Sequence, residues 1–149
     1  MSTFVRRLIL LLFALSGAFV GFWAYFAPGS WYRSFPGLGL RWLPVLGPYN
    51  EHLAKDVGAM YLALTVLSLV AVRRAENALL VQAAGLAWLV FGVPHLVYHL
   101  QHLDMYGTRD QVLNAVSLSL FVVGAVVLLL PGAARSAPRG TTKAAPLPR

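Results

Sequence analysis

Long apolar segments alternate with short polar ones along this chain. Four of the apolar segments run about 8–27, 53–72, 78–99 and 112–130. Each is close to the roughly 20 residues that an α-helix needs to cross a bilayer. The pattern therefore predicts an all-α fold, a four-transmembrane-helix bundle that occupies residues 1–131.

Local signals indicate where these helices begin and where one of them bends. Asn50 is expected to cap the second helix, and Glu51 suits the positive end of its dipole. Thr108 and Gln111 have the spacing of a capping box at the start of the fourth helix. Pro94 removes a hydrogen bond from the third helix, so a kink is expected there, either at a functional site or as a simple bend for packing.

The segment 29–50 between the first two helices is rich in aromatic residues, glycine and proline. Amphipathic aromatic side chains favour the headgroup region of a bilayer. We therefore expect an interfacial or re-entrant outer loop over the bundle, which acts as an ordinary aromatic belt or as a lid over a lipid-accessible site. Its aromatic residues are Trp31, Tyr32, Phe35, Trp42 and Tyr49.

Composition places the chain in a membrane rather than in water. Of its 149 residues, 58% are hydrophobic and only 11% are charged, whereas about a quarter are charged in an ordinary soluble domain. The absence of cysteine excludes disulfides, iron–sulfur clusters, thiolate metal sites and cysteine nucleophiles. The net charge of +7 is carried by residues that flank apolar segments, so the predicted partner is the lipid bilayer and not nucleic acid.

The distribution of basic residues predicts the orientation. Most of them lie before the first helix, between the second and third, or after the fourth, and these are Arg6, Arg7, Arg73, Arg74, Arg135, Arg139, Lys143 and Arg149. The positive-inside rule therefore places both termini in the cytoplasm. The first segment also has features of a signal peptide, but its hydrophobicity continues to Phe26, which favours a retained helix. The basic tail 132–149 is expected to be disordered.

The third predicted helix ends in a cluster of histidines. His95, His99 and His102 are spaced i, i+4 and i+7, so on a helix they share one face. The second helix carries His52 and Asp56 at the same outward level, spaced i, i+4. Ionisable groups at membrane depth are costly and are candidates for a functional site.

The fourth helix carries a third polar stripe at this level, formed by Asp110, Asn114 and Ser117. Three helices thus bring a polar face to the same end of the bundle. We therefore predict an outward-facing His/Asp site between them.

A metal ion, zinc or copper, is the first ligand expected there, because neutral imidazole is a common ligand of both. His95 and His102 are about 10 Å apart along a straight helix and cannot readily share one ion. The feasible pairs are His95 with His99 or His99 with His102, completed by His52 or Asp56. His99 belongs to both pairs and is the first residue to test.

Other chemistry fits the same residues. A ladder of histidines with Asp56 and Asp110 suits proton movement or pH sensing. A membrane enzyme acting on a lipid or other apolar substrate would use His99 or His52 as acid or base, oriented by Asp56. The cluster also fits a structural or accessory subunit, with histidines that hydrogen-bond neighbouring helices and headgroups.

Small and polar residues elsewhere predict helix contacts. Gly17 and Gly21 have the spacing that lets two helices approach closely, either in a homo-oligomer or within the chain. Ser68 and Gln82 are expected to make hydrogen bonds between helices.

Two stretches of the sequence carry a resemblance to a known class of proteins. The stretch from Gly47-Pro48-Tyr49-Asn50 to Gly58 and the stretch Pro94–Asp104 resemble small four-helix membrane proteins of actinobacteria, a family without a characterised function. The resemblance covers about residues 5–131 and implies a bacterial plasma membrane. The general layout is also similar to that of DoxX-like four-helix proteins. Neither resemblance implies a catalytic residue or a substrate.

Overall fold

The computed structural model describes residues 1–131, and within this range it is helical with no strand. Four helices are long and apolar enough to cross a membrane. They are α1 (Thr3–Phe26), α3 (Glu51–Arg73), α4 (Ala78–Gln101) and α5 (Thr108–Leu129). The predicted four-helix fold is confirmed, with boundaries shifted by a few residues. The tail predicted to be disordered, 132–149, lies outside the described residues.

Two connections lie at one end of the bundle, which we call the loop end (27–50 and 102–107). The first consists of a short helix, α2 (Pro28–Ser34), and an irregular segment 35–50. Trp31 and Trp42 are buried there, so this segment packs onto the bundle. The second connection contains a single 3₁₀ turn, η1 (Leu103–Met105).

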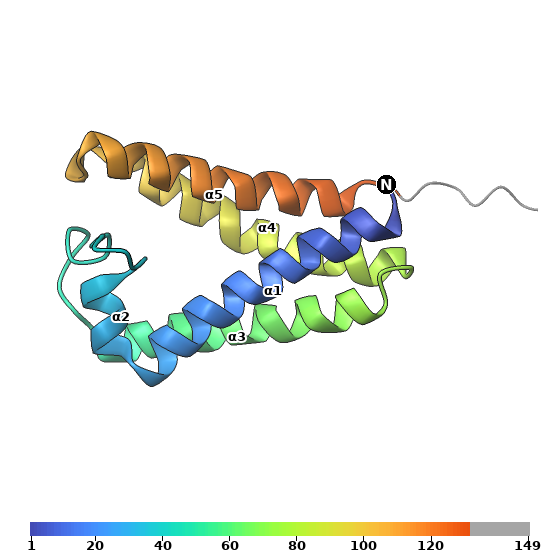
Figure 1. The fold of residues 1–149 in the computed structure, drawn as a ribbon, viewed down its shortest axis with the longest axis horizontal. Helices are drawn as coiled ribbons and strands as arrows, with labels where there is room; N and C mark the ends of the chain where they lie inside the picture. The colour runs from blue at the N-terminus through green and yellow to red at the C-terminus, as the bar shows by residue number, and fades with distance from the viewer. Residues whose placement is uncertain (132–149) are drawn as a thin grey trace, which may run out of the picture.

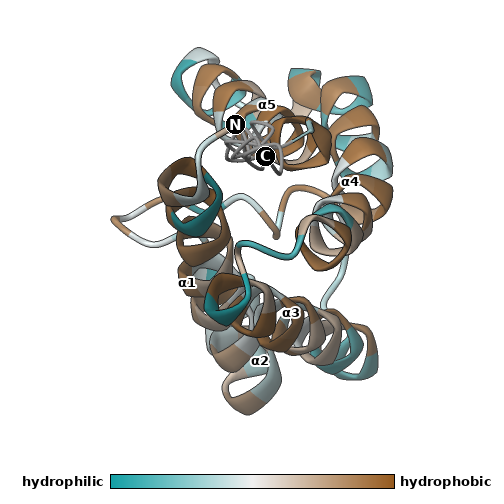
Figure 2. Ribbon diagram, turned by 90° about the vertical axis from the view of Figure 1, so that its right-hand side faces the viewer, coloured by the Kyte–Doolittle hydropathy of each residue, from teal (hydrophilic) through white to brown (hydrophobic). Residues whose placement is uncertain are grey.

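The long helices form two antiparallel pairs, α1 with α3 and α4 with α5 (Figure 1). The pairs lie close together at the end that holds the N-terminus and separate toward the loop end, where the segment 35–50 lies between them. Figure 2 shows apolar residues along the helices and hydrophilic residues gathered near their ends, as expected for a bundle that spans a bilayer.

Glycines let the two helices of each pair approach closely. A Cβ atom at Gly58 of α3 would lie 2.6 Å from the backbone nitrogen of Tyr25 in α1. One at Gly85 of α4 would lie 2.8 Å from Cβ of Leu128 in α5. These distances leave no room for a side chain, so the glycines set the spacing of each pair.

Gly17 and Gly21 face α3 of the same chain. A Cβ atom at Gly17 would lie 2.6 Å from the Thr65 hydroxyl oxygen, and one at Gly21 would lie 2.9 Å from Leu62. Both glycines are buried. Of the two roles expected for this motif, the structure therefore supports packing within the chain, because α3 occupies the surface that a homo-oligomer would need.

Two polar side chains, Ser68 and Gln82, take part in hydrogen bonds between helices in the half of the bundle near the N-terminus. Nε1 of Trp88 donates to the Ser68 hydroxyl at 2.9 Å, and that hydroxyl donates to the Leu64 carbonyl at 2.8 Å. Nε2 of Gln82 donates to the Leu129 carbonyl at 3.1 Å. The expected bonds of Ser68 and Gln82 between helices are confirmed.

One of the two predicted helix caps is confirmed and the other is wrong. The Asn50 side chain accepts a hydrogen bond from the Leu53 amide at 3.0 Å and caps α3. At the start of α5 the capping residue is Gly107, without a side-chain bond. Gln111 does not complete a capping box with Thr108, because its side chain donates to the Tyr106 carbonyl instead, at 2.9 Å.

Candidate functional site

The polar stripes of α4 and α5 meet in the interior near the loop end. His99 is 6% exposed and Asn114 is 0% exposed. The two helices are antiparallel, with Gly92 against Val122. About two helical turns further toward the loop end, the same register brings His99 level with Asn114. Two of the three predicted stripes thus lie at one level on neighbouring helices.

Several polar atoms of this cluster are buried without a hydrogen-bond partner among residues 1–131. They are Nδ1 of His99, Oδ1 of Asp110, and both Oδ1 and Nδ2 of Asn114. A buried polar group left without a partner costs about 1–3 kcal/mol. Ser68 and Gln82 in the other half of the bundle have partners, and outside the loop end only Arg6, among the described residues, has buried side-chain atoms without one.

The segment 35–50 is tied to this cluster by one hydrogen bond. Tyr106 donates its hydroxyl to the Trp42 carbonyl at 3.0 Å. The Asn114 amide lies close enough to this hydroxyl to oppose the rise in the pKa of Tyr106, but it forms no hydrogen bond within the usual limits of distance and angle. The Trp42 amide in turn donates to the Phe35 carbonyl at 2.9 Å. Burial raises the pKa of Tyr106 to about 12, so the hydroxyl keeps its proton near neutral pH.

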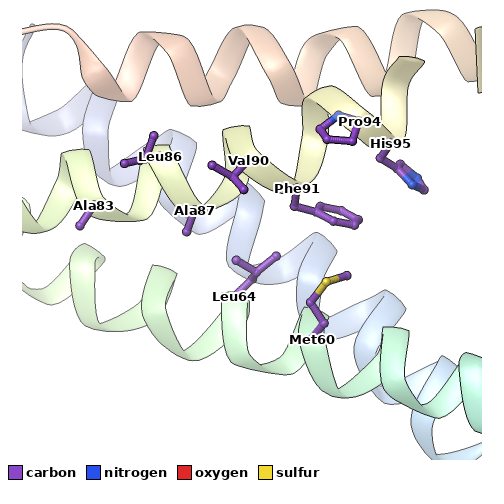
Figure 3. Close-up of a pocket in the computed structure, with 9 residues that line it drawn as sticks. All are labelled: Met60, Leu64, Ala83, Leu86, Ala87, Val90, Phe91, Pro94 and His95. Carbon is purple, nitrogen blue, oxygen red and sulfur yellow. The ribbon is translucent and has the colours of Figure 1, made fainter. Parts of the chain in front are cut away.

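A groove between α3 and α4 opens on the side of the bundle (Figure 3). It holds about 740 Å³ and is open rather than enclosed, as a furrow between two helices is. Its lining residues are Met60, Leu64, Ala83, Leu86, Ala87, Val90, Phe91, Pro94 and His95. His95, at the loop-end side of the groove, is the only one of these that can ionise.

The His95 ring joins the groove to the buried cluster. It stacks on Phe91 with ring centres 5.0 Å apart, and it meets the His99 ring edge-on at 4.7 Å. Phe91 and His95 line the groove, whereas His99 does not line it and is buried. Apolar and polar surfaces are therefore connected through two imidazole rings.

His102 departs from the predicted face. α4 ends at Gln101, and His102 is its C-cap. The His102 ring stacks on Tyr98 with centres 4.2 Å apart, and its Nδ1 donates to the Tyr98 carbonyl at 2.7 Å. The shared face therefore holds for His95 and His99 but is wrong for His102, because the chain leaves the helix and the ring turns back onto its last turn.

His52 and Asp56 lie on the surface of α3. Their side chains are 86% and 61% exposed, and Nε2 of His52 is 3.4 Å from Oδ2 of Asp56. The structure does not bring this pair together with His99. The physical reason is that α3 packs against α1, and the two helix pairs separate toward the loop end.

The predicted zinc or copper site is not assembled in the part of the chain that the structure describes. No three or more His, Cys, Asp or Glu side chains are grouped there so that they could hold a metal ion. The candidate set of His95, His99, His102, His52 and Asp56 thus divides into a ring pair, a capping residue and a surface pair. The proton-relay and lipid-enzyme hypotheses stay predictions.

Two residues, Trp42 and Tyr106, link the segment 35–50 to the cluster, and the sequence pattern does not identify either of them. The available signal was a tyrosine in a short polar turn between two apolar helices, where a buried hydroxyl needs a partner.

Comparisons with protein-family models, curated proteins and solved structures find no match to this chain.

Proposed function

We propose that this multi-pass membrane protein binds an amphipathic, lipid-like molecule near its loop end. The hydrocarbon part would lie in the groove between α3 and α4, and the polar part would contact His95 and the cluster of His99 and Asn114. The contact between the His95 and His99 rings carries the proposal, because it connects an apolar groove to buried polar atoms that need partners.

The chemistry of the orphan atoms indicates the kind of polar group. The Asn114 amide offers one donor nitrogen and one acceptor oxygen, and the His99 ring offers a further nitrogen. A hydroxyl or a secondary amide both donates and accepts hydrogen bonds, so it can satisfy these atoms and follow a hydrocarbon chain into the membrane. With the positive-inside orientation, the site belongs to the outer leaflet.

The proposal is tested with a phospholipid that carries a photoreactive diazirine in its acyl chain. The full chain is reconstituted in nanodiscs with this probe, and the labelled peptides are identified by mass spectrometry. We expect label to concentrate in the groove segment 83–91 of α4. Ala87→Phe fills the groove and should reduce this label at least fivefold.

The matched control is Val123→Phe, which enlarges an exposed side chain on α5 that does not line the groove. This variant should leave the groove label unchanged. Label spread evenly over all lipid-facing helices, and equally insensitive to both substitutions, would show that the groove is ordinary surface and would refute the proposal. Asn114→Leu tests the polar part, since it should shorten the retention of the probe without moving the label.

A further inference from the structure

Arg6 is a buried cation at the end of the bundle opposite the loop end. It lies in the first turns of α1 and is only 4% exposed. Its Nη1 is 3.5 Å from the Ala75 carbonyl, at the outer limit of a hydrogen bond. Its Nε and Nη2 are buried without a partner among the described residues. A guanidinium in this position needs an anion.

The chain has no carboxylate side chain to supply that anion. It contains five acidic residues. Four of them lie at the loop end, in the first turns of α3 and around the turn from α4 to α5. The fifth, Glu76, already binds Nη2 of Arg7 at 2.7 Å. Arg73, Arg74 and the N-terminal ammonium add further positive charge at this end.

We propose that Arg6 holds a phosphate group, supplied by the headgroup of a phospholipid in the leaflet at this end of the bundle. The guanidinium presents a planar fork of N–H donors that matches phosphate oxygens. Arg6 lies at the level where the four long helices begin or end, so a modest rotation of its flexible stem brings the orphan N–H groups to the interface. This site is independent of the groove and of the function proposed above.

The full chain in neutral, lipid-free detergent is titrated with dioleoyl phosphatidylglycerol, and binding is followed by native mass spectrometry. A second arm uses dioleoylglycerol, which lacks the phosphate, and a third uses inorganic phosphate. We expect the phospholipid to bind and the diacylglycerol not to. Arg6→Met should weaken phospholipid binding by about tenfold or more, because charge-assisted bonds are lost.

Arg74→Met is the matched control, because it removes the same charge from an exposed position at the same end. It should weaken binding less than about threefold, as expected for a screened surface charge. Arg6→Lys keeps the charge but loses the fork, so its loss should lie between those of the two methionine variants. Equal losses in the two methionine variants would reduce the site to a general basic surface and would overturn the proposal.

Thermal melting separates this role from a structural one. Without lipid, Arg6→Met should melt no lower than the parent, because a buried charge without a counter-ion does not stabilise the fold. A lower melting temperature, or failure to fold, would mean that Arg6 serves the bundle itself and would overturn the proposal. Binding of inorganic phosphate as tight as that of the phospholipid would overturn the lipid as the source of the phosphate.

Discussion

Asn114→Leu is expected to stabilise the protein, although it replaces a fully buried polar residue. The Asn114 side chain is 0% exposed, and both of its amide atoms have no partner among residues 1–131. Removing such a group recovers about 1–3 kcal/mol. Leucine has the same number of side-chain heavy atoms in a similar branched shape, so the cost of overpacking is small. A gain of about 2 kcal/mol changes the ratio of folded to unfolded protein by roughly thirtyfold.

The same substitution at Asn77 provides a control with the opposite sign. The Asn77 side chain accepts a hydrogen bond from the Leu80 amide at 3.1 Å and caps α4. Losing a cap of this kind costs about 1 kcal/mol. The same substitution of asparagine by leucine should therefore stabilise the bundle at position 114 and destabilise it at position 77.

The measurement is reversible unfolding in mixed micelles, with the unfolding free energy obtained by titration with a denaturing detergent. Probe retention in the crosslinking assay is measured on the same preparations. Asn114→Leu should raise the free energy of unfolding while it shortens probe retention, the trade-off expected of a residue kept for binding. A loss of stability at Asn114 comparable to that at Asn77 would refute the reasoning, because it would show that the amide already makes a stabilising bond.

Three further predictions concern the helix pairs, the bond between Tyr106 and the segment 35–50, and an ion pair on the surface. Gly58→Ala should destabilise the protein by about 1–3 kcal/mol, because the added Cβ would lie 2.6 Å from the α1 backbone. Gly92→Ala has its nearest contact at 3.5 Å and should be neutral or stabilise the protein by up to about 1 kcal/mol. Unfolding titrations compare the two variants. Burial raises the pKa of Tyr106 from about 10 to about 12, so the contribution of the protonated hydroxyl to stability is complete below pH 10 and falls as the pH rises toward 12. The unfolding free energy of Tyr106→Phe should fall less over this range. Equal pH profiles of the two proteins would contradict this. Glu76→Gln breaks an exposed ion pair and should cost at most about 1 kcal/mol at low salt, and less at high salt, in melting curves.

The helices were predictable from the sequence, but their partners were not. Apolar runs near the length of a bilayer crossing specify α1, α3, α4 and α5 regardless of what each one packs against. Which helices pair depends on positions such as Gly58 and Gly85, where the missing side chain lets one backbone approach another. A pattern of apolar residues all round a helix does not reveal these contacts.

For the candidate site as well, the sequence predicts the level of a residue along the bundle better than its neighbours. His99 and Asn114 were placed correctly at one level because antiparallel neighbours share a register. His52 was misplaced because a common depth in the membrane does not imply a common neighbour, and α3 turns toward α1 instead. His102 was misplaced because helix periodicity fails past the last turn, where a ring can bond a free carbonyl of its own helix.

The pairing of the helices bears on how the chain is made. Each pair consists of helices that follow one another in the sequence, and only the short turn 74–77 separates the first pair from the second. Synthesis proceeds from the N-terminus, and inserted helices associate within the bilayer. The hairpin of α1 and α3 can therefore assemble while the ribosome is still translating α5. Because the groove is lined by α3 of the first hairpin and α4 of the second, it forms only once α4 has docked against α3, and the proposed ligand site is absent until that step.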